Sequence, residues 1–233
     1  MSELLPGLAS VKENIEKAAR RAGRDPACVE LVAVSKTHPP EAIREAMECG
    51  HLLFGESRVQ EARLKIPLLP ERARWHFIGH LQRNKVRQAL PLFELFHGID
   101  SVQIARDMDR TGRELGLHPR ILLEVNMAGE SSKFGFTPEA VRRDLEEMLT
   151  LERVQVDGLM TIAPLAPEAE ASRRFFAELW DLRDELQAAA GVSLKHLSMG
   201  MSQDYVVAVE EGATLVRVGT AVFGARGKTA EGE

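Results

Sequence analysis

The feature that most constrains the fold of this chain is a regular alternation of short apolar runs with amphipathic stretches. Apolar, β-branched runs predict strands at 30–35, 51–54, 74–78, 94–98, 120–125, 154–161, 194–198 and 214–218. Between them, apolar residues at helical spacing predict helices near 40–49, 57–66, 82–90, 101–116, 137–149, 168–190 and 202–211. This alternation is typical of a parallel sheet covered by helices, because each parallel connection needs a crossover segment.

The number of strand–helix units indicates which parallel architecture to expect. Eight units in 233 residues predict an α/β protein with a single (β/α)8 barrel domain spanning residues 1–233. A doubly wound open sheet has the same local pattern, and counting strands does not exclude it. An extra N-terminal helix is expected at 7–22, and the small, charged tail at 226–233 is expected to fray.

Composition argues against several functional classes. The net charge of −5 argues against nucleic-acid or anionic-membrane binding, and no apolar run is long enough to span a bilayer. The first residues lack the basic and apolar regions of a signal peptide. Cys28 and Cys49 have no metal-type spacing, so reduced thiols in a cytoplasmic protein are expected.

The first predicted strand runs into Lys36, and functional side chains of such barrels lie at the carboxyl ends of strands. A lysine at a strand end is most often a solvated cation. Its alternative role is a Schiff-base amine, which must be neutral to react. Its pKa must therefore be lowered by desolvation or by a nearby positive charge.

The loops after the last two strands carry small and hydroxyl residues. Ser198, Gly200 and Ser202 lead into one helix, and Gly219-Thr220 opens another short segment. Phosphate sites of barrels are built from the loops after strands seven and eight. Either loop alone is explained by a tight turn, but the two together favour a phosphate-binding cup.

Arg217 lies two residues before Gly219, so period-two alternation places both residues on the same face of the strand. An arginine directed into a barrel is costly unless it is paired. Two roles remain open for it. It either forms a structural ion pair with an acid such as Glu124 or faces the ring nitrogen of a cofactor.

Two histidines, His76 within the third predicted strand and His80 just after it, could suggest a metal, but no third ligand with suitable spacing accompanies them. Packing and loop roles are therefore expected, and no metal site is predicted. Residues 131–135 are expected to form a loop after the fifth strand, over the barrel mouth.

Taken in order, the motifs of this chain resemble the pyridoxal phosphate homeostasis proteins over about residues 7–225. The resemblance rests on Ala33-Val34-Ser35-Lys36, Phe54-Gly55-Glu56, Val59-Gln60-Glu61, residues 76–85, Val125-Asn126, Glu130, Lys133-Phe134-Gly135, Gly158-Leu159-Met160, residues 197–204, residues 216–220 and Phe223-Gly224. The family is similar to the N-terminal barrel domain of bacterial alanine racemase.

The resemblance implies a cofactor, a site and a role. Pyridoxal 5′-phosphate would be held as a Schiff base on Lys36, with its phosphate on Ser198, Gly219 and Thr220 and the backbone of Met199 and Gly200. Arg217 would face the pyridine nitrogen and keep it unprotonated, which weakens the ring as an electron sink. The implied role is intracellular cofactor homeostasis by a monomer without substantial catalysis, with cofactor-dependent apoenzymes as partners. Ser57 replaces the asparagine usual in the family, so its contact with the cofactor is left open.

Two other functions remain as alternatives. A pyridoxal-phosphate-dependent amino-acid racemase needs a second acid/base opposite the lysine. The only tyrosine, Tyr205, falls in the helix after strand seven, and neither a second base nor a second domain is evident. A non-enzyme is therefore expected. A barrel that binds a phosphate ligand without a covalent link, with Lys36 as a plain cation, is the third possibility.

Overall fold

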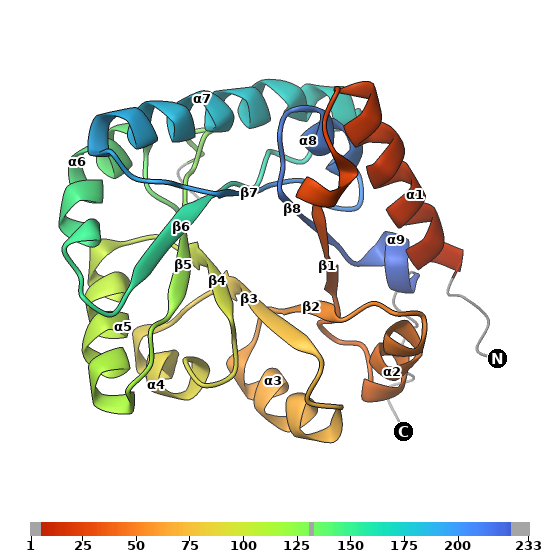
Figure 1. Cartoon of the computed structure of the whole chain (residues 1–233), viewed down its shortest axis with the longest axis horizontal. Helices are drawn as coiled ribbons and strands as arrows, with labels where there is room; N and C mark the ends of the chain where they lie inside the picture. Colours follow the sequence, from red (N-terminus) through yellow and green to blue (C-terminus); the bar gives the residue numbers. More distant parts are fainter. Residues whose placement is uncertain (1–5, 131–132, 225–233) are drawn as a thin grey trace.

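A computed structural model describes residues 6–130 and 133–224 and shows a closed barrel of eight parallel strands in sequential order (Figure 1). The strands are β1 (Glu30–Val34), β2 (Leu53–Glu56), β3 (Arg74–His80), β4 (Leu95–Ile99), β5 (Arg120–Glu124), β6 (Gln155–Met160), β7 (His196–Ser198) and β8 (Leu215–Val218). The fraying predicted at 226–233 lies outside the described residues.

The helices occupy the outside of the barrel; α1 precedes β1, and each later helix follows one strand. They are α1 (Pro6–Arg21), α2 (Pro40–Glu48), α3 (Val59–Lys65), α4 (Val86–Ala89), α5 (Val102–Leu115), α6 (Pro138–Leu149), α7 (Arg173–Ala190), α8 (Tyr205–Glu210) and α9 (Thr220–Phe223). Short 3-10 turns lie at η1 (Pro26–Cys28), η2 (Ile66–Leu68), η3 (Arg83–Lys85) and η4 (Ala169–Ser172). No helix among the described residues has the length and apolar composition needed to cross a bilayer.

Closure of the sheet decides between the two architectures that the sequence left open. Strand β1 pairs with β2, through Ala33 opposite Phe54, and also with β8, through Val32 opposite Arg217. An open sheet would leave β1 or another strand with a free edge. The predicted (β/α)8 barrel is therefore confirmed.

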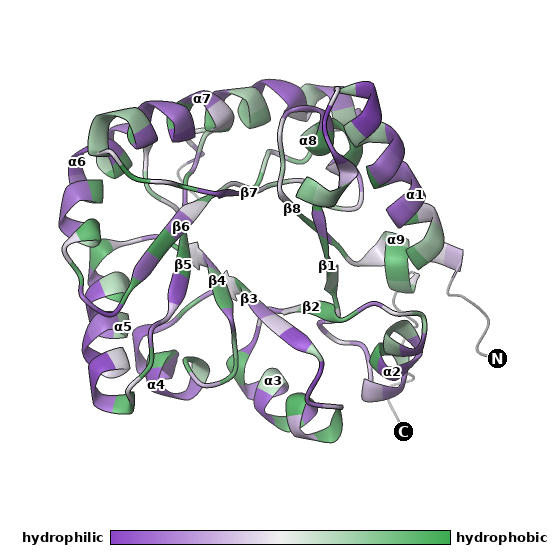
Figure 2. Cartoon of the chain, in the orientation of Figure 1, coloured by the Kyte–Doolittle hydropathy of each residue, from purple (hydrophilic) through white to green (hydrophobic). Residues whose placement is uncertain are grey.

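Side chains alternate between two apolar cores along each strand. On β1, Leu31 and Ala33 belong to the large core between the sheet and the helices, whereas Val32 points into the barrel. The interior cluster contains Val32, Leu53, Leu95, Leu122, Met160 and Leu215. The surrounding helices carry both hydrophobic and hydrophilic residues, as expected of helices that pack one side on the sheet and expose the other (Figure 2).

The extra N-terminal helix is present and completes the outer layer. α9 has only four residues, and α1 packs beside α8 and α9, next to β1 (Figure 1). The backbones approach closely, since a Cβ atom at Gly7 would lie 2.4 Å from the carbonyl oxygen of Ala221. The first helix of the chain therefore covers the barrel where the last strand meets the first.

Some boundaries differ from those predicted. The second strand was expected at 51–54 and runs from Leu53 to Glu56, because its ladder with β3 starts at Leu53 opposite Arg74. The helix expected at 82–90 is split into η3 and α4. Local apolar runs locate an element, but the partner strand decides where pairing begins and ends.

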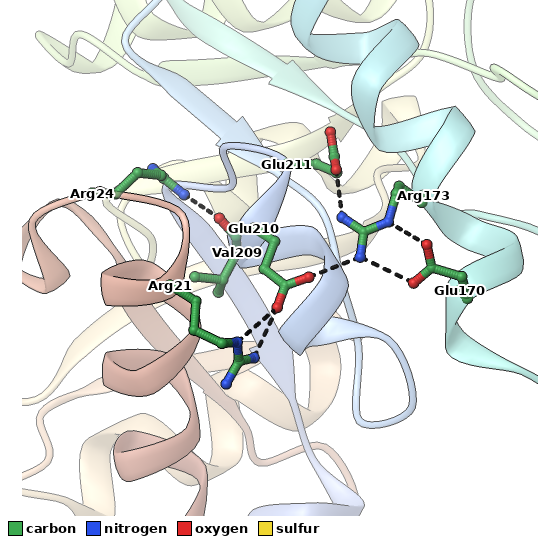
Figure 3. A network of polar contacts seen from close by, with 7 residues as sticks. All are labelled: Arg21, Arg24, Glu170, Arg173, Val209, Glu210 and Glu211. Carbon is green, nitrogen blue, oxygen red and sulfur yellow. Dashed lines mark hydrogen bonds and ion pairs between the residues drawn. The ribbon is translucent and has the colours of Figure 1, made fainter.

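An ion-pair network links the start of α7 to α8 and α1 (Figure 3). The guanidinium of Arg173 pairs with Glu170, Glu210 and Glu211. Glu210 also accepts from Arg21 Nη2 at 2.8 Å. These carboxylates raise the pKa of Arg173, led by Glu170, so the arginine stays charged. The network holds the segment that enters α7 against the neighbouring helices.

Candidate functional site

A cavity of about 700 Å³ opens where the loops after β1, β6, β7 and β8 meet. Such a volume is typical of a small-molecule site. Four of the seven predicted site residues line it, namely Lys36, Arg217, Gly219 and Thr220. The rest of the wall comes from Val34, Ile78, Lys133 and parts of the segments 162–172 and 201–204.

Lys36 lies directly after β1, and its exposed side chain lines the cavity. Within 6–130 and 133–224, no hydrogen bond or ion pair engages its ammonium group. The loop around it is well defined. Thr37 has a φ of 66°, and its N–H donates to Glu61 Oε1 at 2.6 Å. The backbone is thus fixed, while no group in the described part of the chain occupies the amine of Lys36.

A buried charged cluster supports this loop. Lys65 Nζ lies 2.7 Å from Glu56 Oε1 and donates to the carbonyl oxygen of Ser35 at 2.9 Å. The hydroxyl of Ser35 donates to the same Glu56 oxygen at 2.7 Å. Burial raises the pKa of Glu56, and the hydrogen bonds from Lys65 and Ser35 oppose that rise. Lys65 therefore ties α3 to the residue that precedes Lys36.

Arg217 is buried on β8 and also lines the cavity. Its Nη1 donates to Ser198 Oγ, and its Nη2 donates to the carbonyl oxygen of Thr161 at 2.9 Å. Burial lowers its pKa to about 10, so it remains charged at neutral pH. No carboxylate among the described residues lies within ion-pair distance of it. The alternative role of a direct ion pair with Glu124 is therefore not seen.

The loops after β7 and β8 meet at one side of the cavity. Gly219 packs closely on β1, since a Cβ atom there would lie 3.3 Å from the carbonyl oxygen of Val34. Ser202 Oγ accepts from the N–H of Ala221 at 3.4 Å, which joins the two loops. Ser202 and Thr220 therefore bring two hydroxyls to the wall where the phosphate cup was predicted.

The other predicted phosphate residues lie away from the cavity wall. Ser198 is fully buried, and its hydroxyl oxygen is bonded to Arg217 and to His97. Met199 is buried in the outer core. Gly200 has a φ of 88°, and its carbonyl oxygen accepts from the N–H of Arg217 at 3.0 Å. Ser202, rather than Ser198, is the serine of this loop that lines the cavity.

Asp204 and Ser202 were not among the predicted site residues, although both lie in the motif after β7. Asp204 lines the cavity, and its Oδ1 accepts from the N–H of Met201 at 2.7 Å, which orders the turn before α8. Ser57 lies outside the cavity wall, in a separate depression beside His80. Ser198 ends β7 and faces the barrel interior, whereas Ser202 lies in the turn beyond the strand and faces the cavity.

His76 and His80 point to different partners. His76 Nδ1 lies 3.0 Å from His97 Nε2 inside the barrel. His80 Nδ1 lies 2.9 Å from Asp100, and its ring stacks on Phe134 with 4.1 Å between centroids. In the part of the chain that the structure describes, no three acidic, histidine or cysteine side chains are grouped for a metal ion.

Comparison with known proteins first defines the class. The family model for the N-terminal domain of alanine racemase matches residues 7–227. An alanine racemase of Clostridium difficile 630 has the same fold, with a TM-score of 0.73 at 15% identity over 97% of this chain and 58% of that one. The chain is therefore a barrel of the alanine racemase N-terminal type.

Closer relatives define the branch. The pyridoxal phosphate homeostasis protein of Aquifex aeolicus is 46% identical over 94% of this chain and 96% of that protein. The protein of the same name from Escherichia coli K12 is 39% identical over 97% of this chain and 98% of its own length. The chain belongs to the alanine racemase N-terminal domain family, among the pyridoxal phosphate homeostasis proteins.

Solved structures agree with this placement. PipY of Synechococcus elongatus PCC7942, in a structure with pyridoxal phosphate bound, is 42% identical and superposes with a TM-score of 0.80, over 91% of this chain and all of PipY. The structure of PipY without the cofactor superposes with a TM-score of 0.83.

Proposed function

We propose that this protein binds pyridoxal 5′-phosphate and serves its homeostasis, with Lys36 as the covalent anchor. The observation that carries the proposal is a lysine amine with no partner among the described residues, on a cavity that also holds a buried arginine and two hydroxyl-bearing loops. Lys36 Nζ would condense with the cofactor's aldehyde, which would form a C=N bond and release water. The binding of the same cofactor by PipY supports this proposal.

The side chains on the wall match the functional groups of the cofactor. We assign the phosphate to the loops that hold Gly219, Thr220 and Ser202, where backbone N–H groups and hydroxyls donate. Of the other residues that the family resemblance implied for the phosphate, Ser198 is bonded to Arg217, and Met199 and Gly200 lie in the turn that leads from β7 to Ser202. We assign the ring nitrogen to Arg217, whose positive charge disfavours protonation of that nitrogen.

We propose that the protein holds its cofactor without substantial catalysis. A pyridine ring facing an arginine is a weak electron sink, which suits carriage better than carbanion chemistry. Tyr205, the base that a racemase would require, is buried, and its hydroxyl accepts from Asn14 Nδ2 at 3.0 Å on the α1 side. The relatives are named homeostasis proteins, which agrees with this view.

We further propose that a monomer delivers the cofactor to cofactor-dependent apoenzymes in the cytoplasm. Cys28 and Cys49 are free thiols, as in proteins of reducing compartments. Mixing the loaded protein with an apoenzyme, and following recovery of that enzyme's activity against free cofactor at the same concentration, tests delivery.

Reduced-adduct mapping tests the cofactor and the anchor together. After incubation with pyridoxal phosphate and borohydride reduction, mass spectrometry should place the adduct on Lys36. Lys36→Met should lose the adduct and the imine absorption band. Lys133→Met is the matched control, because Lys133 lines the same cavity but pairs with Glu130 at 2.9 Å.

Three results would change the assignment. Full absorption in Lys36→Met would show that another lysine is the anchor. Phosphate-competitive binding without any adduct would favour the non-covalent phosphate barrel. Exchange of the α-proton of an L- or D-amino acid at enzyme-like rates would favour the racemase.

A further inference from the structure

A file of polar side chains crosses the interior of the barrel beneath Arg217. His97 Nδ1 lies 2.8 Å from Ser198 Oγ, and His97 Nε2 lies 3.0 Å from His76 Nδ1. This file consists of Arg217, Ser198, His97 and His76. Each of these side chains is at most 5% exposed, and they share the barrel interior with the apolar cluster around Val32. Burying polar groups among aliphatic side chains is costly unless every donor meets an acceptor.

The chemistry of these groups allows one arrangement of protons. Arginine has donors only, so Ser198 Oγ accepts from Arg217. Among the described residues, His97 Nδ1 is the one acceptor available to the hydroxyl proton of Ser198. His97 must therefore carry its proton on Nε2, from which it donates to His76 Nδ1. Each bond in the file is directed away from the cavity.

The two imidazoles remain neutral, as this arrangement requires. Burial lowers the pKa of His76 to about 3, and burial lowers that of His97 well below its ordinary value. Positive charge from Arg217 and the neighbouring ring of His76 act on His97 in the same direction. A charged His97 would be a donor at both nitrogens, so the hydroxyl proton of Ser198 would lose its acceptor.

We propose that His97, aligned by His76, is a positioning residue that holds Ser198 as an acceptor for Arg217 and so fixes the guanidinium at the cavity wall. This inference rests on the proposed function, in which Arg217 faces the ring nitrogen of the cofactor. Without His97, the hydroxyl of Ser198 loses its acceptor. Arg217 is then held by the carbonyl oxygen of Thr161 and attracted by Glu124 and Asp204.

The test compares His97→Leu with His97→Asn and with His51→Leu. Asparagine keeps an acceptor near the position of Nδ1. His51 is another buried histidine, bonded to the carbonyl oxygen of Leu53 at 2.7 Å and to none of Arg217, Ser198, His97 and His76, so it controls for loss of a buried ring. The readouts are the dissociation constant for pyridoxal phosphate, the pH midpoint of its absorption band and the adduct on Lys36.

We expect His97→Leu to bind about tenfold more weakly, because a hydrogen bond to a charged group loses its support. We also expect the pH midpoint of the band to move by about one unit while the adduct stays on Lys36. His97→Asn should recover most of both values, and His51→Leu should match the wild type. A His97→Leu variant that behaves like His51→Leu would overturn the inference.

One further measurement uses the ligand-free wild type, so its result does not depend on whether the variants fold. Nitrogen-15 NMR should show His97 neutral at pH 6 with its proton on Nε2. A protonated Nδ1 would overturn the inference even if the variants fail to fold. Absence of an adduct in the wild type would instead refute the proposed function and, with it, the role of the file toward a cofactor.

Discussion

At the scale of single residues, Ser198 and Ser202 show how neighbours in one motif take different roles. Ser198 is the last residue of β7 and turns into the barrel, where it bonds to Arg217 and His97. Ser202 lies in the loop beyond and lines the cavity. The first therefore acts on the ring-nitrogen side of the proposed site, and the second acts on the phosphate side.

Lys65 provides a residue-scale prediction about the loop that carries Lys36. Lys65→Met should lower the free energy of unfolding by about 3 kcal/mol, because it leaves the carboxylate of Glu56 buried without its cation. Urea unfolding measures this value. Adding Glu56→Gln to the variant should restore part of the loss, because the amide buries no charge. An unchanged urea midpoint in Lys65→Met would contradict this view.

At the scale of elements, close strand contacts depend on glycine. Gly158 on β6 faces the backbone of β7, and a Cβ atom there would lie 1.9 Å from the carbonyl oxygen of His196. Backbone cannot move aside as a flexible side chain can. The register between β6 and β7 therefore requires a residue without a side chain.

Gly158→Ala should consequently destabilise the protein by about 3 kcal/mol, the upper range for overpacking. The matched control is Gly116→Ala at the end of α5. Gly116 has a φ of 69° with no atom near its Cβ position, so only backbone strain of about 1 kcal/mol is expected there. Thermal unfolding of both variants measures the difference, and equal losses would argue against the strand contact.

At the scale of the whole molecule, buried neutral histidines link stability to pH. Burial lowers the pKa of His51 to about 4 and that of His76 to about 3. The folded state therefore binds their protons less tightly than the unfolded chain, whose histidines titrate near 6.5. Their contribution to stability is fully present above that value and is lost as the pH falls toward the folded pKa values.

The free energy of unfolding should thus fall by roughly 2 kcal/mol for each of these histidines between pH 8 and pH 5. His51→Leu removes one contribution, so its loss of stability over this range should be smaller by about that amount. Urea titrations of both proteins at each pH test the difference. Parallel pH curves for the two proteins would show that His51 does not titrate on unfolding.

The sequence by itself determined the elements and the positions of most strand ends. Period-two and helical spacing located all eight strands and the long helices. The same strand ends marked Lys36, Arg217, Gly219 and Thr220, which do meet at one cavity.

Only the tertiary structure decided which polar groups meet across the barrel. The bond between Ser198 and His97 joins residues 101 positions apart, and the bond from Lys65 to the carbonyl oxygen of Ser35 joins residues 30 apart. The face of the strand or helix on which a side chain lies follows from local periodicity, which can be read from the neighbouring residues in the sequence. The residue that a side chain meets across the barrel depends on closure of the sheet and on strand register. A one-residue shift in the register would change which groups meet.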